Sequence, residues 1–139
     1  MGDAAADKQL VLEFWGVEPA DKHRYFADDV VWHLPNSVAA RFPNGAHLHG
    51  PEVVALFGGP QQHYAERTWR IDHVVGEDDM VALHCTMDGW TVSGNRYVNS
   101  YHFLFRLDDG LIAEGWEFLD TAYAFERLGP KLPDSADGP

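Results

Sequence analysis

The segment Leu111–Gly129, with the sequence LIAEGWEFLDTAYAFERLG, predicts a β-strand that leads into a short helix. Ile112, Trp116 and Phe118 lie an even number of positions apart and are expected on one face of the strand, followed on the same face by Asp120. A carboxyl group beside an apolar wall has a raised pKa, which suits proton transfer. Aspartate at this position is also a favoured helix N-cap, worth about 1 kcal/mol. Both roles remain open for Asp120.

The segments that precede this strand predict an antiparallel meander. Asp109-Gly110 is a strong tight-turn signal between 96–107 and the strand that begins at Leu111. Further strands are expected from Trp69 for about eight residues and at Met80–Asp88. Alternation predicts an inward face of the 96–107 strand made of Tyr97, Tyr101, Phe103, Phe105 and Leu107. It places on the outer face of the sheet Arg96, Ser100, His102, Arg106 and Glu117, in contact with water or a second subunit.

The N-terminal part of the chain predicts helices. Apolar residues recur at helical spacing between an N-cap near Asp3 and a stop at Gly16, and proline opens two more helices at 19–26 and 51–57. A strand is expected at 30–34, a loop at 36–50 and a possible helical turn at 61–66. This order predicts an α+β fold, in which a curved antiparallel sheet wraps around N-terminal helices to form a cone with an internal cavity, closed by a short C-terminal helix.

The bulk composition fits one domain. We expect a flexible start at residues 1–9, a single cone domain at 10–129 and a disordered tail at 130–139. The 139-residue chain is 45% hydrophobic and has a formal net charge of −12, which argues against nucleic acid or an anionic membrane as a partner. One cysteine, Cys85, allows no internal disulfide. Without a signal-like or membrane-length apolar run, we expect a cytoplasmic protein.

Three segments resemble the SnoaL-like group of the nuclear transport factor 2-like fold, the cone shared by polyketide cyclases and ketosteroid isomerases. They are Tyr25–Pro35 (YFADDVVWHLP), Gly50–Phe57 (GPEVVALF) and Asp108–Asp120 (DDGLIAEGWEFLD). The resemblance extends from about residue 10 to 129. It implies the cone fold, but this superfamily contains isomerases, cyclases, dehydratases, epoxide hydrolases and proteins without enzymatic activity.

The resemblance favours a cyclase over the other enzymes of the group. Trp116 and Asp120 keep the four-residue spacing of the strand tryptophan and acid/base aspartate of SnoaL-type cyclases. Leu34 stands where ketosteroid isomerases have their basic aspartate, and Phe14 lies near the position of their tyrosine. Phe118 occupies the position of an aspartate of limonene epoxide hydrolases. By this comparison, the isomerase and hydrolase mechanisms lack their catalytic groups here.

Histidine and aromatic residues supply the remaining candidates. His33, at the end of the first strand, is the second candidate for catalysis as a proton relay to Asp120. His47 and His49 form an H-x-H pair, but no Cys, Asp or Glu follows at a suitable spacing, so we expect no metal. No phosphate-binding loop or nucleotide motif is present, and no cofactor is expected. The candidate ligand-binding residues are Tyr25, Trp32, Asn99, Tyr101, Phe103, Trp116 and Phe118.

The sequence therefore predicts a cofactor-free acid/base enzyme, of cyclase, isomerase or dehydratase type. Its substrate would be a small, mostly apolar carbonyl or polyketide-like compound, with Asp120 moving the proton while Trp116 and Tyr101 position the substrate. The alternative is a non-catalytic module of the same fold that binds a small ligand or dimerises. In either case we expect a homodimer formed through the outer face of the sheet.

Overall fold

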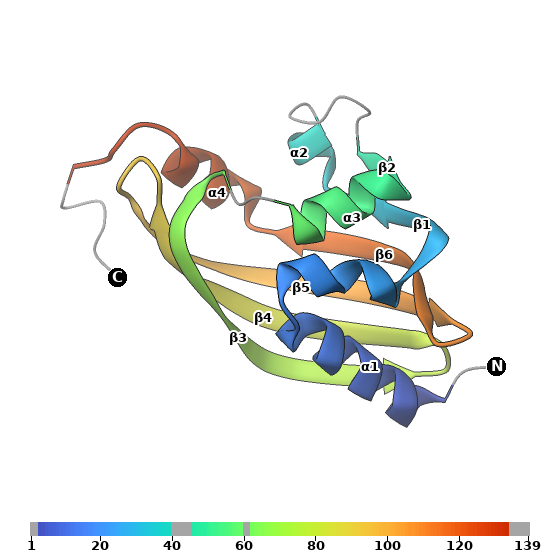
Figure 1. The fold of residues 1–139 in the computed structure, drawn as a ribbon. Helices are drawn as coiled ribbons and strands as arrows, with labels where there is room; N and C mark the ends of the chain where they lie inside the picture. Colours follow the sequence, from blue (N-terminus) through green and yellow to red (C-terminus); the bar gives the residue numbers. More distant parts are fainter. Residues whose placement is uncertain (1–2, 40–45, 60–61, 134–139) are drawn as a thin grey trace.

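The computed structural model describes residues 3–39, 46–59 and 62–133, so part of the loop expected at 36–50 and of the tail expected at 130–139 lies outside the described residues. Three helices and a 3₁₀ helix accompany the first two strands, followed by four long strands and a last helix (Figure 1). The elements in order are α1 (Ala4–Gly16), η1 (Pro19–Tyr25), β1 (Phe26–His33), α2 (Asn36–Ala39), β2 (His47–His49), α3 (Pro51–Gly58), β3 (Tyr64–Glu77), β4 (Met80–Thr91), β5 (Arg96–Asp108), β6 (Leu111–Leu119) and α4 (Thr121–Leu128).

One curved six-stranded sheet, with the order β2-β1-β6-β5-β4-β3, organises the fold and does not close into a barrel. Figure 1 shows α1, η1 and α3 lying across one face of this sheet, which confirms the α+β cone expected from the sequence. The sheet is not entirely antiparallel, because β1 pairs in parallel with β6. These two strands lie far apart in the chain, so no hairpin imposes an antiparallel pairing on them.

The ends of the helices follow from local chemistry. The side chain of Asp3 accepts hydrogen bonds from the backbone N–H groups of Ala5 and Ala6, both at 3.2 Å, and so caps α1 as expected. The segment that begins at Pro19 is a 3₁₀ helix rather than an α-helix. Phe26 already pairs with Ile112, so β1 begins at residue 26 instead of residue 30.

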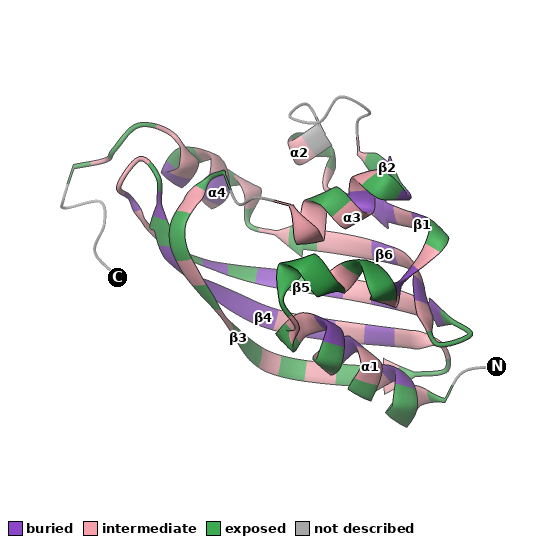
Figure 2. Cartoon of the chain, in the orientation of Figure 1, coloured by how far each residue is buried: buried purple, intermediate pink, exposed green. Residues whose placement is uncertain are grey.

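The inner face of the sheet and the helices above it enclose an aromatic core. Figure 2 shows the buried positions along β4 and β5, and alternate residues of β5 from Tyr97 to Leu107 are buried as predicted. The ring of Phe14, on α1, packs edge-on against four other rings within 6.1 Å, those of Tyr25, Phe26, Phe57 and Phe105. Helix α1 is thereby fixed above the middle of the sheet.

Two features of the β5–β6 hairpin orient the site. Asp109 and Gly110 both have positive φ, 51° and 76°, as a two-residue hairpin turn requires, which confirms the turn predicted at this dipeptide. Next to the turn, the partner of Arg106 is Glu114 while the partner of Leu107 is Ile112, so β6 carries one extra residue. Such a β-bulge reverses which residues of the following strand face the core.

The prediction that Trp116 and Phe118 share the inner face with Ile112 was therefore wrong. After the bulge, the β6 residues paired with the inward side of β5 are Gly115, Glu117 and Leu119. Phe118 is 53% exposed. The assignment of Glu117 to the outer face was wrong for the same reason, since an uninterrupted alternation was assumed along the whole strand.

Candidate functional site

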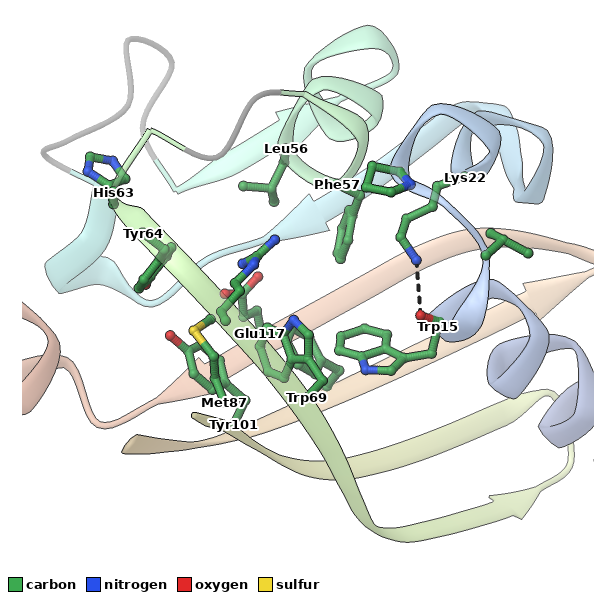
Figure 3. A pocket seen from close by; sticks show the side chains of 14 residues that line it. Trp15, Lys22, Leu56, Phe57, His63, Tyr64, Trp69, Met87, Tyr101 and Glu117 are labelled. Atoms are coloured by element: carbon green, nitrogen blue, oxygen red, sulfur yellow. Dashed lines mark hydrogen bonds between the residues drawn. The ribbon is translucent and has the colours of Figure 1, made fainter. Parts of the chain in front are cut away.

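A pocket of about 390 Å³ lies between the helical layer and the inner face of the sheet (Figure 3). Its wall is mostly aromatic and aliphatic, with a small number of polar groups, which is the usual composition of a small-molecule site. The lining residues are Trp15, Val17, Pro19, Lys22, Leu56, Phe57, His63, Tyr64, Arg67, Trp69, Met87, Tyr101, Phe103 and Glu117.

Glu117 contributes the carboxyl group of this pocket. It faces inward from β6 opposite Phe103, and its Oε1 accepts a hydrogen bond of 3.1 Å from Nε1 of Trp32, a fully buried residue of β1. Burial raises the pKa of Glu117 to about 7, and the hydrogen bond from Trp32 and the positive charge of Arg67 oppose this rise only in part. A carboxyl group with such a pKa can both accept and donate a proton near neutral pH.

The packing of Gly115 holds Trp32 in place. A Cβ atom added to Gly115 would collide with the six-membered ring of the Trp32 indole, so only glycine allows the indole to lie flat on β6. The indole N–H then reaches the next inward residue of the strand, Glu117. The orientation of the carboxyl group thus depends on a glycine that does not itself line the pocket.

The hydroxyl group of Tyr101 faces the pocket and is hydrogen-bonded to a second tyrosine. Its oxygen lies 2.8 Å from that of Tyr97, and the side-chain amide of Asn99 donates to the Tyr97 oxygen at 2.8 Å. Either hydroxyl of this pair can be the donor, and Tyr64 also hydrogen-bonds with both. The Tyr101 hydroxyl thus belongs to a network of three tyrosines, and it can turn its proton towards a ligand when Tyr97 donates to it. Burial raises the pKa of Tyr101 far above its usual value, so the group stays a neutral donor.

Two cations enter the pocket from different elements. Nζ of Lys22, on η1, donates to the backbone oxygen of Phe14 at 2.5 Å and to that of Trp15 at 3.2 Å, where α1 ends; Figure 3 shows the bond to Trp15. Burial, and then the charge of Arg67, lower the pKa of Lys22 to about 8. Arg67 lies on β3 with its guanidinium 5.5 Å from the Tyr64 ring and 5.7 Å from the Trp69 ring, and burial lowers its pKa.

Asp120, the acid predicted from the sequence, lies outside this group of residues. It is exposed at the N-terminus of α4, and its Oδ1 accepts a hydrogen bond of 3.0 Å from the backbone N–H of Tyr123. Its backbone oxygen accepts a further hydrogen bond from Asn99. The structure thus shows the capping role of Asp120, and catalysis by this residue stays a prediction.

His33 is the last residue of β1 and points to the face of the sheet opposite the pocket, where it joins a cluster of polar residues. Its Nε2 lies 2.7 Å from Oε2 of Glu114, and its Nδ1 lies 2.7 Å from Nδ1 of His47. The hydrogen bond with His33 lowers the pKa of Glu114. The imidazole ring of His33 also stacks on the indole ring of Trp116. The predicted relay between His33 and Asp120 has no contact that supports it in the described part of the chain.

The candidate ligand-binding residues separate into three groups. Tyr101 and Phe103 line the pocket, whereas Trp32 and Asn99 lie behind it and hold Glu117 and Tyr97. The third group does not line the pocket: Tyr25 packs against Phe14, and Trp116 and Phe118 face outward. Among the described residues, no three His, Cys, Asp or Glu side chains are placed to share a metal ion.

Among the polar residues that line the pocket, the sequence analysis missed Lys22, His63, Tyr64 and Arg67, and it placed Glu117 on the wrong face. The inward position of Glu117 was missed because the bulge reverses the alternation along β6. A glycine inside a strand, here Gly115, is nevertheless a sequence signal of irregular or close backbone packing. Arg67 was missed because β3 was expected to begin at Trp69, with a helical turn before it, and in fact begins at Tyr64. Pairing with β4 extends this strand by residues whose own sequence carries no clear strand pattern.

The sequence was compared with models of protein families. The model of the SnoaL-like domain matches residues 12–115. The chain belongs to the SnoaL-like family. No curated protein sequence matches this SnoaL-like chain. Within its described residues, no helix has both the length and the apolar composition needed to cross a membrane.

Solved structures confirm the fold of this SnoaL-like protein. A nuclear transport factor 2-like protein of unknown function from Burkholderia pseudomallei is 20% identical, with a TM-score of 0.76 over 88% of this chain and 97% of its own. A protein described as a SnoaL-like polyketide cyclase, from a Jannaschia species, is 15% identical, with a TM-score of 0.74 over 93% and 95%. A phenazine biosynthesis-related protein from Pseudomonas aeruginosa is 17% identical, with a TM-score of 0.72 over 93% and 88%. At these identities the likeness concerns the fold alone.

Proposed function

We propose that this protein is an acid/base enzyme that moves a proton on a small, flat, mostly apolar carbonyl compound bound in the pocket. The observation that carries the proposal is the carboxyl group of Glu117, held by Trp32 inside an aromatic-lined pocket with a pKa of about 7. The cyclase name of the Jannaschia relative and the biosynthetic name of the Pseudomonas relative agree with a small organic substrate.

Each group has a defined part in the proposed reaction. The ionised Glu117 removes a proton from the carbon next to the carbonyl, so that the C–H bond breaks, an O–H bond forms on Glu117 and the electron pair moves to the carbonyl oxygen. The hydroxyl group of Tyr101 donates a hydrogen bond to that oxygen as its negative charge develops. Return of the proton from Glu117 to another atom of the enolate completes an isomerisation. Attack of the enolate carbon on a second carbonyl would instead close a ring, with a new C–C bond in place of the carbonyl π bond and the proton of Glu117 passing to the resulting alkoxide.

Proton abstraction can be measured without knowledge of the natural substrate. We suggest 2-tetralone, a small flat ketone, in D₂O, with NMR to follow exchange of the protons next to its carbonyl. Wild-type protein should accelerate the exchange, and the rate should rise with pH through about 7 as Glu117 ionises. Glu117→Gln should lower the enzymatic rate by about 100-fold or more, since general acid/base catalysis contributes about that factor.

Two further variants make this experiment decisive. Glu126→Gln, on the exposed side of α4, removes a glutamate of the same region outside the pocket and should exchange at the wild-type rate. Asp120→Asn removes the acid predicted from the sequence but keeps a good N-cap. If Asp120→Asn lost the activity while Glu117→Gln kept it, Asp120 would be the catalytic acid and the proposal for Glu117 would be wrong.

The non-catalytic alternative predicts a different result. The capping hydrogen bond of Asp120 is the observation that favours it, because that carboxylate is engaged by the backbone of α4. If the wild-type protein bound 2-tetralone, seen as line broadening or chemical-shift changes of the ligand, without any faster exchange, the protein would be a binding module for such compounds.

A further inference from the structure

The net charge of the pocket has the opposite sign to the net charge of the whole chain. The chain has 22 acidic and 10 basic residues, yet two of the basic residues, Lys22 and Arg67, line the pocket together with one carboxyl group, that of Glu117. Because the pKa of Glu117 is about 7, this carboxyl group is only partly ionised at neutral pH. The pocket therefore carries excess positive charge inside a protein of strongly negative net charge.

Of the two cations, Arg67 has fewer hydrogen-bonding partners than Lys22 in the part of the chain that the structure describes. Within the described residues its guanidinium group forms no hydrogen bond or ion pair and lies between the faces of Tyr64 and Trp69. Burial lowers its pKa, since no nearby anion compensates fully for the lost hydration. Arg70, three residues along the same strand, is different: it forms an ion pair of 2.7 Å with Asp72, which raises the pKa of Arg70.

Lys22 adds to the same imbalance. Two of the three N–H groups of its ammonium are used by the backbone oxygens of Phe14 and Trp15, which leaves one for the pocket. The charges of Lys22 and Arg67 disfavour each other, since Arg67 contributes to the lowered pKa of Lys22. A ligand anion between them would compensate both charges.

The apolar wall beside these cations is suited to an aromatic ring. The indole of Trp15 lies 5.2 Å from that of Trp69 and 4.8 Å from the ring of Phe103, and Trp69 lies 5.0 Å from Tyr101 (Figure 3). These side chains come from α1, β3 and β5 and meet in the pocket. A flat ligand would find ring faces and edges on several sides at once.

We propose that the pocket binds flat aromatic acids, with the carboxylate of the ligand paired to the guanidinium of Arg67 and its ring packed among Trp15, Trp69 and Phe103. This inference rests on the proposed function, because it names the substrate class of the same site. The planar guanidinium can pair with a carboxylate through two hydrogen bonds, whereas a neutral amide of the same shape offers no charge to compensate. The remaining atoms of the ligand stay apolar.

The test compares 2-naphthoate with the neutral 2-naphthamide, which has nearly the same shape, by isothermal titration calorimetry at low ionic strength. Wild-type protein should bind 2-naphthoate at least about tenfold more tightly. Arg67→Gln should remove this preference, and Arg70→Gln, which removes an arginine from the other face of β3, should keep it. Should Arg67→Gln fail to fold, added salt should still weaken binding of 2-naphthoate to the wild-type protein more than binding of 2-naphthamide.

Two results would overturn the inference: equal affinity of the wild-type protein for the two compounds, or a preference for 2-naphthoate that survives in folded Arg67→Gln. The outcome is separate from that of the proposed function, because binding needs no turnover. Preference for the acid without exchange of 2-tetralone protons would refute only the catalytic proposal. Exchange without preference for the acid would refute only the present inference.

Discussion

Glu117 shows how a group suited to catalysis reduces stability. Its carboxyl group has a pKa of about 7 in the folded protein, against about 4.5 for an ordinary glutamate. Between these values the folded state holds a proton that the unfolded state has lost, so stability falls as the pH rises from about 4.5 to 7. Above pH 7 the folded protein instead contains an ionised carboxylate with incomplete hydration.

We therefore predict that Glu117→Gln stabilises the protein at pH 8. The amide oxygen can still accept the hydrogen bond from Trp32, while the cost of ionising a buried group disappears. The gain in the free energy of unfolding should be at most roughly 3 kcal/mol, from about 1.4 kcal/mol per pKa unit. Urea denaturation at pH 8 and at pH 4 measures it.

The pH dependence distinguishes this effect from a change in packing. The difference between Glu117→Gln and wild type should vanish near pH 4, where both side chains are neutral, and Glu126→Gln should change little at either pH. An equal effect of Glu117→Gln at pH 4 and pH 8 would mean that the ionisation of Glu117 has no part in stability.

Asp120 and Glu117 also show what a residue pattern can miss. Both are acids on or after the last strand, and the spacing from Trp116 pointed to Asp120. The capping role predicted for Asp120 needs only its neighbours in the chain, and the structure has it. The position of Glu117 depends on Trp32, which is 85 residues away in the sequence, so no local pattern contains it.

At the level of elements, the bulge of β6 and the glycine beyond it determine what the last strand presents to the pocket. Gly115 lets the indole of Trp32 cross β6 in close contact. The insertion of Ala113, between the residues paired with Leu107 and Arg106, turns Glu117 inward. The two features act together, since the bulge brings Gly115 itself to the inner face.

We predict that Gly115→Ala destabilises the protein by about 1–3 kcal/mol or more, the usual cost of overpacking, because the added methyl group displaces Trp32. Proton exchange of 2-tetralone should also fall, since the indole N–H leaves Glu117. Gly16→Ala at the end of α1 is the matched control, as an added Cβ meets no atom within 4 Å there. Denaturation curves that coincide for Gly115→Ala and wild type would contradict this account of the packing.

At the level of the whole molecule, the outer face of the sheet exposes apolar side chains without a covering layer. Trp90, Val98 and Phe118 come from three neighbouring strands and are 39%, 43% and 53% exposed. A homodimer through this face stays a prediction, and these residues are where a partner copy would pack. The pocket lies on the other face, so such a dimer would leave it accessible.

We expect Phe118→Lys to weaken self-association at least tenfold in sedimentation velocity over a range of concentrations, because a charge would replace the most exposed ring of this face. Val92→Lys, an exposed apolar residue in the turn between β4 and β5, should leave the association unchanged. A wild-type protein that stays monomeric at all concentrations would exclude the dimer.

Local sequence patterns were sufficient to predict many of the secondary-structure elements of this protein. Periodicity, caps and turn residues predicted the long strands, the Asp109-Gly110 hairpin and the caps at Asp3 and Asp120, because each depends on neighbours in the chain. The resemblance of three segments to the SnoaL-like group predicted the family. The start of β3, the phase of β6 and the position of Glu117 against Trp32 and Arg67 did not follow from local patterns. These depend on pairing and packing between distant strands, where one inserted residue reverses a face, so the pocket and its charges exist only in the assembled sheet.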